Sequence, residues 1–438
     1  MKKIILYRGK TVDCDIFKPT NYASFFEDYK SSGGNVGNKL FNTAAEKYIT
    51  NTYTNYKYVM YDEINYIPFI NIEDVEDANA NFDLVIMPQA NIFCNSIFHK
   101  NLLKMWKKGI EQFKIPVFVL GVGIQINKIE DINNLVESIR TEASEFISAV
   151  YKTGGNFSLR GNYTKLFFEK LGFSKAVVTG CPSMFQYGTG LNLPIKKVDS
   201  TNFKPVINGF HSLFYKNEFS HIFDKYPNAI YLDQDEAANL LYNDSYFNEN
   251  SKKQILQNYT PKEIELSASN RFYLFYDLKT RFDFLKNENF NFSFGPRIHG
   301  NIMAILNGIP GYVYAIDVRT QELAEYFDIP YINKLPKGLD LYELYCNADY
   351  EKFNNSYILK YKKFENFLIN NNIICEPLEK HSNLFDEKFQ KISWQKPTII
   401  NQDKIIGLNN EISKNKFGNL MYSKYKYYLK KIKNRIIK

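Results

Sequence analysis

The chain has 438 residues, of which 45% are hydrophobic and 16% aromatic, which excludes a disordered protein and provides for at least one large core. It contains no run of about 18 apolar residues, so we expect no membrane-spanning helix. The net charge is +8, and residues 414–438 hold nine Lys and Arg but no Asp or Glu. The rest of the chain is therefore close to neutral, which argues against a nucleic-acid-binding protein.

Residues 1–195 alternate predicted strands with predicted helices. The apolar run at 3–7 is too short for a signal peptide, so we interpret it as the first strand. Short strands rich in β-branched residues that alternate with helices predict a parallel sheet covered on both faces. The expected strands are 3–7, 56–61, 84–88, 117–121, 157–160 and 176–179, and the expected helices are 37–49, 99–112, 130–150 and 162–171.

Residues 196–340 predict a second α/β domain, after a segment at 188–204 with few helix or strand signals. Residues 341–400 predict helices that pack back across both domains. The expected fold is therefore two Rossmann-like, doubly wound domains that face a cleft, with ligands at the carboxyl ends of the strands. The expected strands of the second domain are 206–210, 229–232, 291–294, 312–316 and one near 331, and its helices are 235–243, 261–268, 271–286, one after His299 and one from Thr320.

A glycine-rich segment, Gly33-Gly-Asn-Val-Gly-Asn38, precedes the first predicted helix. Glycines allow the backbone to approach an anion or a sugar closely, and the N–H groups at the start of a helix are available to bind it. Gly34, Asn35 and Asn38 are therefore candidate binding residues. A plain glycine-rich turn has the same pattern, so both interpretations stay open.

Gln125 and Arg160 each follow a predicted strand. Gln125 ends the segment Gly121-Val-Gly-Ile-Gln125, which lacks both the G-x-G-x-x-G spacing and the later acidic residue of a dinucleotide site. We therefore interpret this segment as the floor of the cleft, with Gln125 as a hydrogen-bonding group. Arg160 lies between a strand and a helix, where its side chain either contacts an anion in the cleft or pairs at the surface.

The sequence predicts no metal site. Asp233-Gln-Asp235 matches the D-x-D pattern of some sugar transferases, but it precedes a helical start and is interpreted as a helix cap. The histidines lack metal-ligand spacing. The five cysteines are scattered and contain no C-x-x-C pair, which indicates a reducing cytosol with neither a disulfide framework nor a zinc site.

The run from Phe294 to Pro310 is the most informative part of the sequence. It places Arg297 and His299 at a predicted strand-to-helix turn. A guanidinium group and a titratable imidazole beside a helix N-terminus form an anion site with proton-transfer capacity. A lone buried histidine is often only structural, but that interpretation does not account for the arginine, the glycines and the helix start together.

Several blocks in this order resemble the polysaccharide pyruvyl transferase family. They cover roughly residues 30–335, and the most specific is Arg-x-His followed by Gly-x-Pro. The matching blocks are Gly34-Asn-x-Gly37, Gly121-x-Gly-x-Gln125, Ser158-x-Arg160, Leu171-Gly172, Thr179-Gly-Cys-Pro182, Arg297-x-His299, Asn307-Gly-Ile-Pro310 and Asp317-x-Arg-Thr-x-Glu-Leu323.

The resemblance implies two Rossmann-like domains in a GT-B-like arrangement. It also implies transfer of a pyruvyl group from phosphoenolpyruvate, as donor substrate and without a further cofactor, to sugar hydroxyls of a surface polysaccharide or its lipid-linked precursor. Arg160 and Arg297 would then hold the phosphate and carboxylate of the donor, and His299 would be the acid/base residue. The other substrate-binding residues implied by the matching blocks are Gly34, Asn35, Asn38, Gln125, Asn301 and Asp317.

The chain departs from the family pattern at two places. Asn38 and Cys181 stand where the family often has Asp. Either change removes a carboxylate, so the base that activates the acceptor hydroxyl is not assigned.

Two other functions fit parts of the sequence. A glycosyltransferase that uses a nucleotide-activated sugar has the same architecture, but retaining members often carry carboxylates near this turn. No Asp or Glu occurs between Glu288 and Asp317, which favours a compact anionic donor. Some inverting sugar transferases bind the donor phosphate with His and Arg. A non-catalytic glycan-binding protein is the third possibility.

The basic residues 414–438 alternate with apolar residues at helical spacing. A basic amphipathic helix is typical of contact with an anionic membrane surface, whereas a solvated helix packed on its own domain is the alternative. The expected location is cytoplasmic, peripheral on the inner face of the cytoplasmic membrane.

Overall fold

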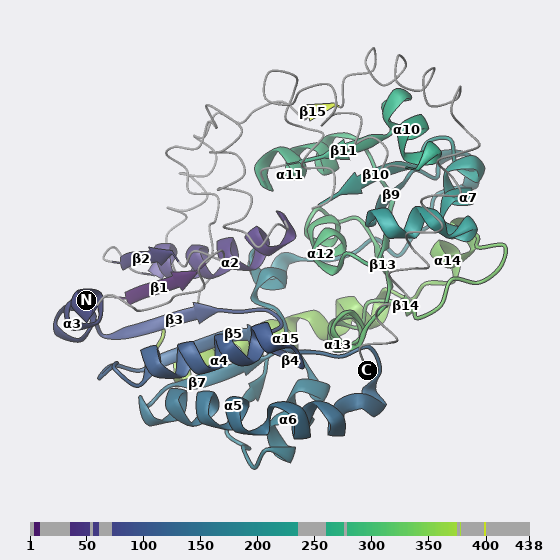
Figure 1. The fold of residues 1–438 in the computed structure, drawn as a ribbon. Helices are drawn as coiled ribbons and strands as arrows, with labels where there is room; N and C mark the ends of the chain where they lie inside the picture. Colours follow the sequence, from purple (N-terminus) through teal and green to yellow (C-terminus); the bar gives the residue numbers. More distant parts are fainter. Residues whose placement is uncertain are drawn as a thin grey trace, which may run out of the picture.

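The computed structural model describes residues 4–8, 36–52, 56–60, 72–234, 260–275, 278–374, 377 and 398–399. It contains two large sheets, each flanked by helices (Figure 1). We call them the N-terminal sheet, with strands between residues 4 and 178, and the C-terminal sheet, with strands between residues 205 and 399. The predicted α/β class with parallel sheets is confirmed.

All strands of the N-terminal sheet run parallel. Their order follows the doubly wound pattern of the flavodoxin type. Two further short strands, β4 (Phe93–Cys94) and β6 (Ile124–Gln125), pair separately. The strands are β1 (Ile4–Arg8), β2 (Tyr56–Met60), β3 (Leu84–Pro88), β5 (Val117–Val122), β7 (Asn156–Leu159) and β8 (Val177–Val178), in the order β2-β1-β3-β5-β7-β8.

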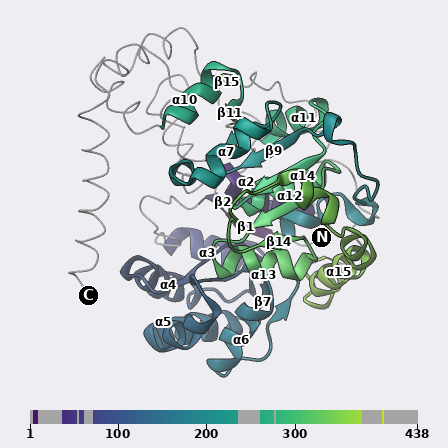
Figure 2. The same ribbon diagram turned by 90° about the vertical axis from the view of Figure 1, so that its right-hand side faces the viewer.

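Side-chain alternation divides the residues of this sheet between two cores. Val85 and Met87 face the helices α4, α5 and α6, which lie together on the outer side of the sheet (Figure 2). Leu84 and Ile86 face α2 and join a core that continues into the C-terminal sheet. The helices are α2 (Val36–Thr52), α3 (Ile72–Asn81), α4 (Ile97–Ile110), α5 (Ile132–Lys152) and α6 (Asn162–Lys170).

The C-terminal sheet is parallel except for β15. Without β15 its strand order is the 3-2-1-4-5-6 order of nucleotide-binding sheets, in which ligands bind where the order reverses. Here that point lies between β9 and β12. The strands are β9 (Pro205–Asn208), β10 (Ile230–Asp233), β11 (Phe272–Leu274), β12 (Phe292–Gly295), β13 (Gly311–Tyr314), β14 (Tyr331–Ile332) and β15 (Thr398–Ile399), in the order β14-β13-β12-β9-β10-β11-β15.

One predicted element of this sheet is wrong. The expected helix at 271–286 is a strand, β11, followed by the helix α11 (Leu278–Asn287). The run Phe272–Phe275 is continuously apolar, a pattern that suits a buried strand as well as a helix, and pairing with β10 decides for the strand. The expected helix at 235–243 lies outside the described residues. The remaining helices around this sheet are α7 (Asn217–Lys225), α10 (Pro261–Ala268), α12 (Ile298–Leu306) and α13 (Val318–Phe327).

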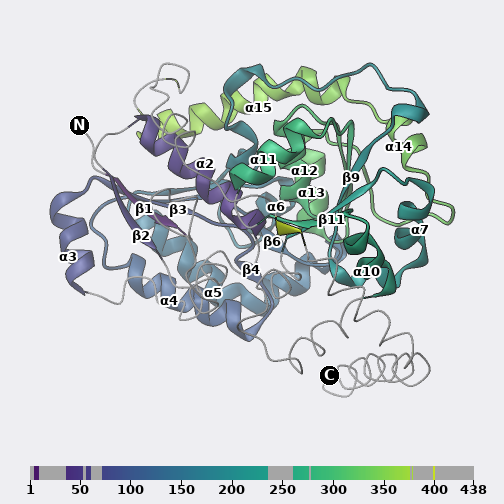
Figure 3. The same ribbon diagram turned by 90° about the horizontal axis from the view of Figure 1, so that it is seen from above.

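Two helices, α14 (Leu341–Asn347) and α15 (Glu351–Asn370), follow the C-terminal sheet. The ring of Tyr345 on α14 packs against Phe292 of β12. Helix α15 runs along one side of the molecule towards α2 (Figure 3), and its Phe364 contacts the ring of Tyr48 on α2. The tyrosine hydroxyl of Tyr357 donates to the carbonyl of Met184, 3.0 Å away. The C-terminal helices therefore contact elements around both sheets.

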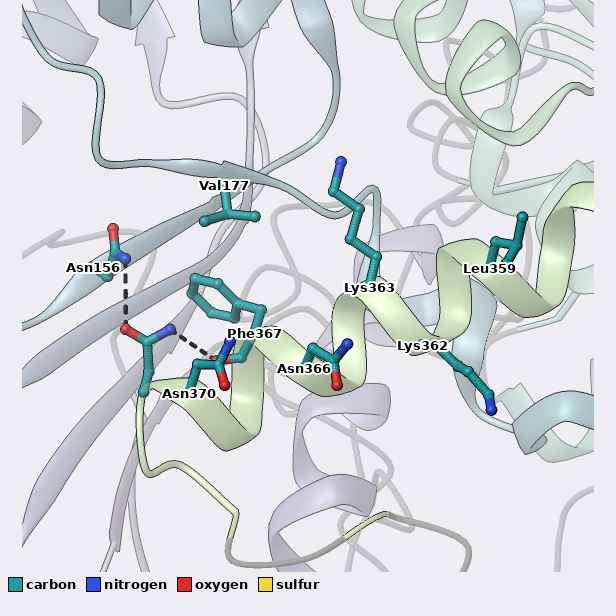
Figure 4. Close-up of a pocket in the computed structure, with 9 residues that line it drawn as sticks. Asn156, Val177, Leu359, Lys362, Lys363, Asn366, Phe367 and Asn370 are labelled. Carbon is teal, nitrogen blue, oxygen red and sulfur yellow. Dashed lines mark hydrogen bonds between the residues drawn. The ribbon is translucent and has the colours of Figure 1, made fainter.

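The cavities found around α15 and α13 lie away from Arg160 and His299. One is a groove of about 570 Å³ between α15 and the β7–β8 edge, with Asn156 at one end and Leu359 at the other (Figure 4). The second, of about 450 Å³, lies between α13, α14 and β14.

Candidate active site

The turn between β12 and α12 is held by a buried amide. The Asn301 Nδ2 group donates to the carbonyls of Gly295 and Arg297, at 2.8 and 3.3 Å, and its Oδ1 accepts from Ser293 Oγ at 2.7 Å. Gly295 has φ +144, and a Cβ there would lie 2.0 Å from the carbonyl oxygen of Asn208, so only glycine fits. Asn301, which the sequence proposes as substrate-binding, therefore shapes the turn with both of its amide atoms.

His299 lies on the first turn of α12 and is buried. Its Nε2 atom is 3.7 Å from Cys181 Sγ, and its ring centroid lies 5.7 Å from that of Phe41 on α2. Burial, followed by the positive charges of Arg160 and Arg319, holds the pKa of His299 well below its ordinary value of 6.5. The imidazole is therefore neutral when no anion is present.

Arg160 extends from the end of β7 towards His299 and is 1% exposed. Its Nε donates to the Gly121 carbonyl at 2.7 Å, and Nη1 donates to Asn91 Oδ1 at 2.8 Å. Within the described residues its buried Nη2 has no hydrogen-bond partner. A buried charged donor without a partner is costly unless a ligand satisfies it, so Arg160 is suited to bind an anion.

The Gly-x-Gly segment at 121–123 makes room for this arginine. A Cβ at Gly123 would lie 2.9 Å from Arg160 Cδ. Gly121 has φ +72, and a Cβ there would lie 2.7 Å from Cδ of Pro182. The segment that the sequence predicts as the floor of the cleft therefore packs against the Arg160 side chain.

Arg319, on the first turn of α13, is a site residue that the sequence reasoning missed. Its positive charge lowers the pKa of both His299 and Arg160, so its guanidinium lies near them. The Nη2 atom is 3.2 Å from Asp317 Oδ2, while within the described residues the buried Nε has no hydrogen-bond partner. Arg319 could have been found from the sequence, because it lies in the Asp317-x-Arg-Thr block that resembles the family.

Asp317 caps α13 and orients this arginine. Its side chain accepts a hydrogen bond from the Thr320 N–H at 2.9 Å, and Thr320 Oγ1 completes a capping box. Its second oxygen faces Arg319. The predicted substrate-binding residue therefore supports an arginine of the candidate site.

Glu322 joins α13 to the helix that follows Arg160. Its Oε1 accepts from the Thr164 N–H at 2.6 Å and its Oε2 from Thr164 Oγ1 at 2.8 Å. Burial is the main cause that raises its pKa to about 7. A Cβ at Gly161 would lie 2.3 Å from Glu322 Cγ, so glycine is required there.

Arg297 contacts the two residues that follow β9. Its guanidinium stacks on the ring of Phe210 at 5.0 Å, and its Nε donates to the Gly209 carbonyl at 3.2 Å. Its charge also lowers the pKa of Arg281, which burial brings to about 10. Arg297 is thus at the point where the C-terminal sheet reverses its strand order.

Gln125 and Asn38 lie at the margin of the site. Gln125 is exposed on β6, and the next carbonyl, that of Ile126, accepts from the Val318 N–H at the start of α13 at 3.1 Å. Asn38 is half-buried on the first turn of α2, and its carbonyl accepts from Asn42 Nδ2. Gly34 and Asn35 lie outside the described residues.

Within the described part of the chain, no three His, Cys, Asp or Glu side chains are grouped so that they could hold a metal ion. Asp233 is buried and accepts from the Tyr231 hydroxyl, and Asp235 lies outside the described residues. None of the described helices is both long enough and apolar enough to span a membrane.

Two largely parallel sheets and a site with a buried arginine, a partly exposed arginine and a buried histidine define an α/β protein whose site suits an anion and a proton-transfer step. The family model of polysaccharide pyruvyl transferase matches residues 35–318, about two thirds of the chain. The chain therefore belongs to the polysaccharide pyruvyl transferase family and is a transferase. The matched region includes Arg160 and His299 and ends one residue before Arg319.

The solved structures similar to this chain include a UDP-N-acetylglucosamine 2-epimerase, with 9% identity and a TM-score of 0.37 over 86% of this chain and 98% of that chain. A putative UDP-N-acetylglucosamine 2-epimerase from Listeria monocytogenes has 8% identity and a TM-score of 0.35 over 95% of this chain and 96% of that chain. No curated protein matches the sequence.

Proposed function

We propose that this transferase moves a pyruvyl group from phosphoenolpyruvate to hydroxyls of a surface polysaccharide or its lipid-linked precursor. The observation that carries the proposal is the buried His299 ring in the combined field of Arg160 and Arg319. Two arginines whose buried N–H groups have no hydrogen-bond partner among the described residues suit a small donor that carries both a phosphate and a carboxylate.

In this proposal Arg160 and Arg319 hold the donor. Guanidinium groups stay charged and bind phosphate and carboxylate oxygens through paired hydrogen bonds. Arg319 thereby takes the donor contact that the family resemblance implied for Arg297. Arg297, which stacks on Phe210, would contact a second part of the substrates.

His299 is the acid of the reaction. A proton passes from its ring to the methylene carbon of the donor, and the neighbouring carbon is attacked by an acceptor hydroxyl, which loses its proton. Phosphate then leaves, and a second hydroxyl of the same sugar adds to complete the ketal while its proton passes to the released phosphate. The neutral imidazole gives its N–H proton to the donor and recovers a proton from the acceptor hydroxyl.

The proposed acceptor, a surface polysaccharide or its lipid-linked precursor, is inferred from the family and from the sequence. We infer contact with an anionic membrane surface through residues 414–438, which lie outside the described residues, and a cytoplasmic, inner-face location where lipid-linked precursors are accessible. Full-length protein should sediment with vesicles of anionic lipid, and protein that ends at residue 413 should not. Equal sedimentation would contradict this part of the proposal.

The test of the donor is direct binding. Isothermal titration with phosphoenolpyruvate should show one site, and His299→Gln should bind the donor but release no phosphate with a lipid-linked oligosaccharide acceptor. Parallel titrations with UDP- and CMP-sugars serve as the comparison. Binding of a nucleotide sugar without binding of phosphoenolpyruvate would replace this proposal with the glycosyltransferase.

A further inference from the structure

Cys181 is fixed against the imidazole of His299 by its neighbours in the chain. The preceding Gly180 has φ +81, and a Cβ there would lie 2.5 Å from the ring of Phe327. The following residue, Pro182, begins a short 3-10 helix, and its carbonyl accepts from the Tyr48 hydroxyl at 2.6 Å. The backbone on both sides of Cys181 is therefore held, and the thiol is fully buried.

The thiol makes two polar contacts. Its Sγ is 3.0 Å from Ser183 Oγ and 3.7 Å from His299 Nε2. The two nitrogens of an imidazole lie on opposite edges of the ring, and in the neutral form one carries hydrogen while the other accepts. Among the described residues no hydrogen bond reaches Nδ1 of His299, so Cys181 is the side chain that can decide which nitrogen carries the hydrogen.

We propose that Cys181 is a positioning residue for His299: Ser183 donates to Sγ, and the thiol S–H donates to Nε2, which places the hydrogen of the neutral imidazole on Nδ1. The Nδ1 edge is then the one that faces the donor. The part of this proposal in which His299 delivers a proton to the donor rests on the proposed function. The part in which Cys181 sets the tautomer of His299 does not.

The charged groups around the pair suit this arrangement. Arg160 and Arg319 both act on the His299 ring, and Arg160 also interacts with Cys181. Tyr48 on α2 is a further titratable group near the thiol. The two positive charges disfavour a permanent imidazolium at His299.

The proton count closes without another reactant. As Nδ1 gives its proton to the methylene carbon of the donor, Nε2 takes the thiol proton. The proton lost by the first acceptor hydroxyl then returns to Nδ1, and Nε2 gives its proton back to sulfur, which restores the starting tautomer of His299 and the thiol of Cys181. No oxidation or reduction takes place.

The first test needs no substrate. In protein labelled with ¹⁵N-histidine, with His299→Gln used to assign the signal, the wild type should show the Nδ1–H tautomer of His299. Cys181→Ser retains a donor and should keep this tautomer, whereas Cys181→Ala should shift it to Nε2–H or a mixture. The control is Cys346→Ala, an exposed cysteine on α14, which should change nothing. An Nε2–H tautomer in the wild type, or an unchanged tautomer in Cys181→Ala, overturns the proposal.

The second test measures turnover. Cys181→Ala should lower kcat about 10-fold, with KM for the donor unchanged within about 2-fold. Loss of a group that transfers the proton directly lowers the rate by roughly 100-fold or more, and Cys181 acts only through His299, so a smaller effect is expected. Cys181→Ser retains a donor to Nε2 and should keep kcat near the wild-type value. Loss of KM and kcat together in Cys181→Ala, without rescue in Cys181→Ser, would indicate a merely structural cysteine. A wild type without activity would refute the proposed function and leave the tautomer result standing.

Discussion

Replacing Arg319 by Gln removes a positive charge beside Arg160 and His299 while keeping a side chain of similar reach. The arginine side chain is 27% exposed, so water partly screens its interaction with an anion. A hydrogen bond to a charged group contributes about 1.5–3 kcal/mol, and partial exposure places this one near the lower value. Because about 1.4 kcal/mol corresponds to a factor of ten, Arg319→Gln should weaken phosphoenolpyruvate binding about 10-fold.

Arg297→Gln is the matched comparison, because the family resemblance assigns the same donor contact to Arg297. Its guanidinium lies on the ring of Phe210, and its charge acts on Arg281. We therefore expect donor binding to change by less than about 3-fold, or under about 0.7 kcal/mol. Isothermal titration of both variants with phosphoenolpyruvate at one ionic strength is the assay.

The comparison also separates binding from folding. In Arg319→Gln the Asp317 side chain keeps its hydrogen bond to Thr320, so α13 stays capped. Loss of the partly exposed ion pair to Asp317 should cost less than about 1 kcal/mol of stability. Weaker donor binding in Arg297→Gln than in Arg319→Gln would refute the assignment of Arg319 and return Arg297 to the donor site.

Three further predictions concern the residues that build the site. Gly123→Ala should lower donor affinity at least about 10-fold in the same titration, because its Cβ would displace the Arg160 side chain, and an unchanged affinity would contradict that packing. Asn301→Ala should lower the free energy of unfolding by about 2–3 kcal/mol in urea, because two buried hydrogen bonds of the turn and one partly buried bond are lost; a change below about 0.5 kcal/mol would return this amide to substrate binding. The pKa of Glu322 is raised to about 7, so its protonation stabilises the fold below about pH 4.5, and that stability is lost as the pH rises through 7. Glu322→Gln should remove this fall, about 3 kcal/mol, from melting curves recorded between pH 5 and 8, while wild-type stability that does not fall would contradict the raised pKa.

Neither α3 nor α7, each of which lies between two predicted strands, was predicted. For the rest of the alternation of strands and helices the sequence was sufficient, because short β-branched runs separated by helical stripes leave few alternatives. It failed where a run had no period. Residues 272–275 are apolar without interruption, and only pairing with β10 makes them a strand.

Arg160 and His299 were recognisable because each stands beside glycines at a strand end. Their neighbours were not. Arg297 and His299 are two residues apart at a helix start, and residues at that spacing do not face each other, so the pair that looks adjacent in the sequence separates in space. Cys181 and His299 lie 118 positions apart, and only the packing of α2 and the 3-10 helix 182–185 against α12 brings them together.

The candidate site exists only when the two sheets are packed together, because Arg160 comes from β7 whereas His299 and Arg319 come from helices that follow strands of the C-terminal sheet. The bonds between Glu322 and Thr164 therefore control more than stability, since they set the distance between the helix after Arg160 and the helix that carries Arg319. A buried carboxylate at the N-terminus of α6 is favourable to the helix dipole, but its charge costs desolvation, which is why its pKa is raised. Loss of the hydrogen bonds between Glu322 and Thr164 should separate Arg160 from Arg319. Donor binding would then weaken although no group that touches the donor has been removed.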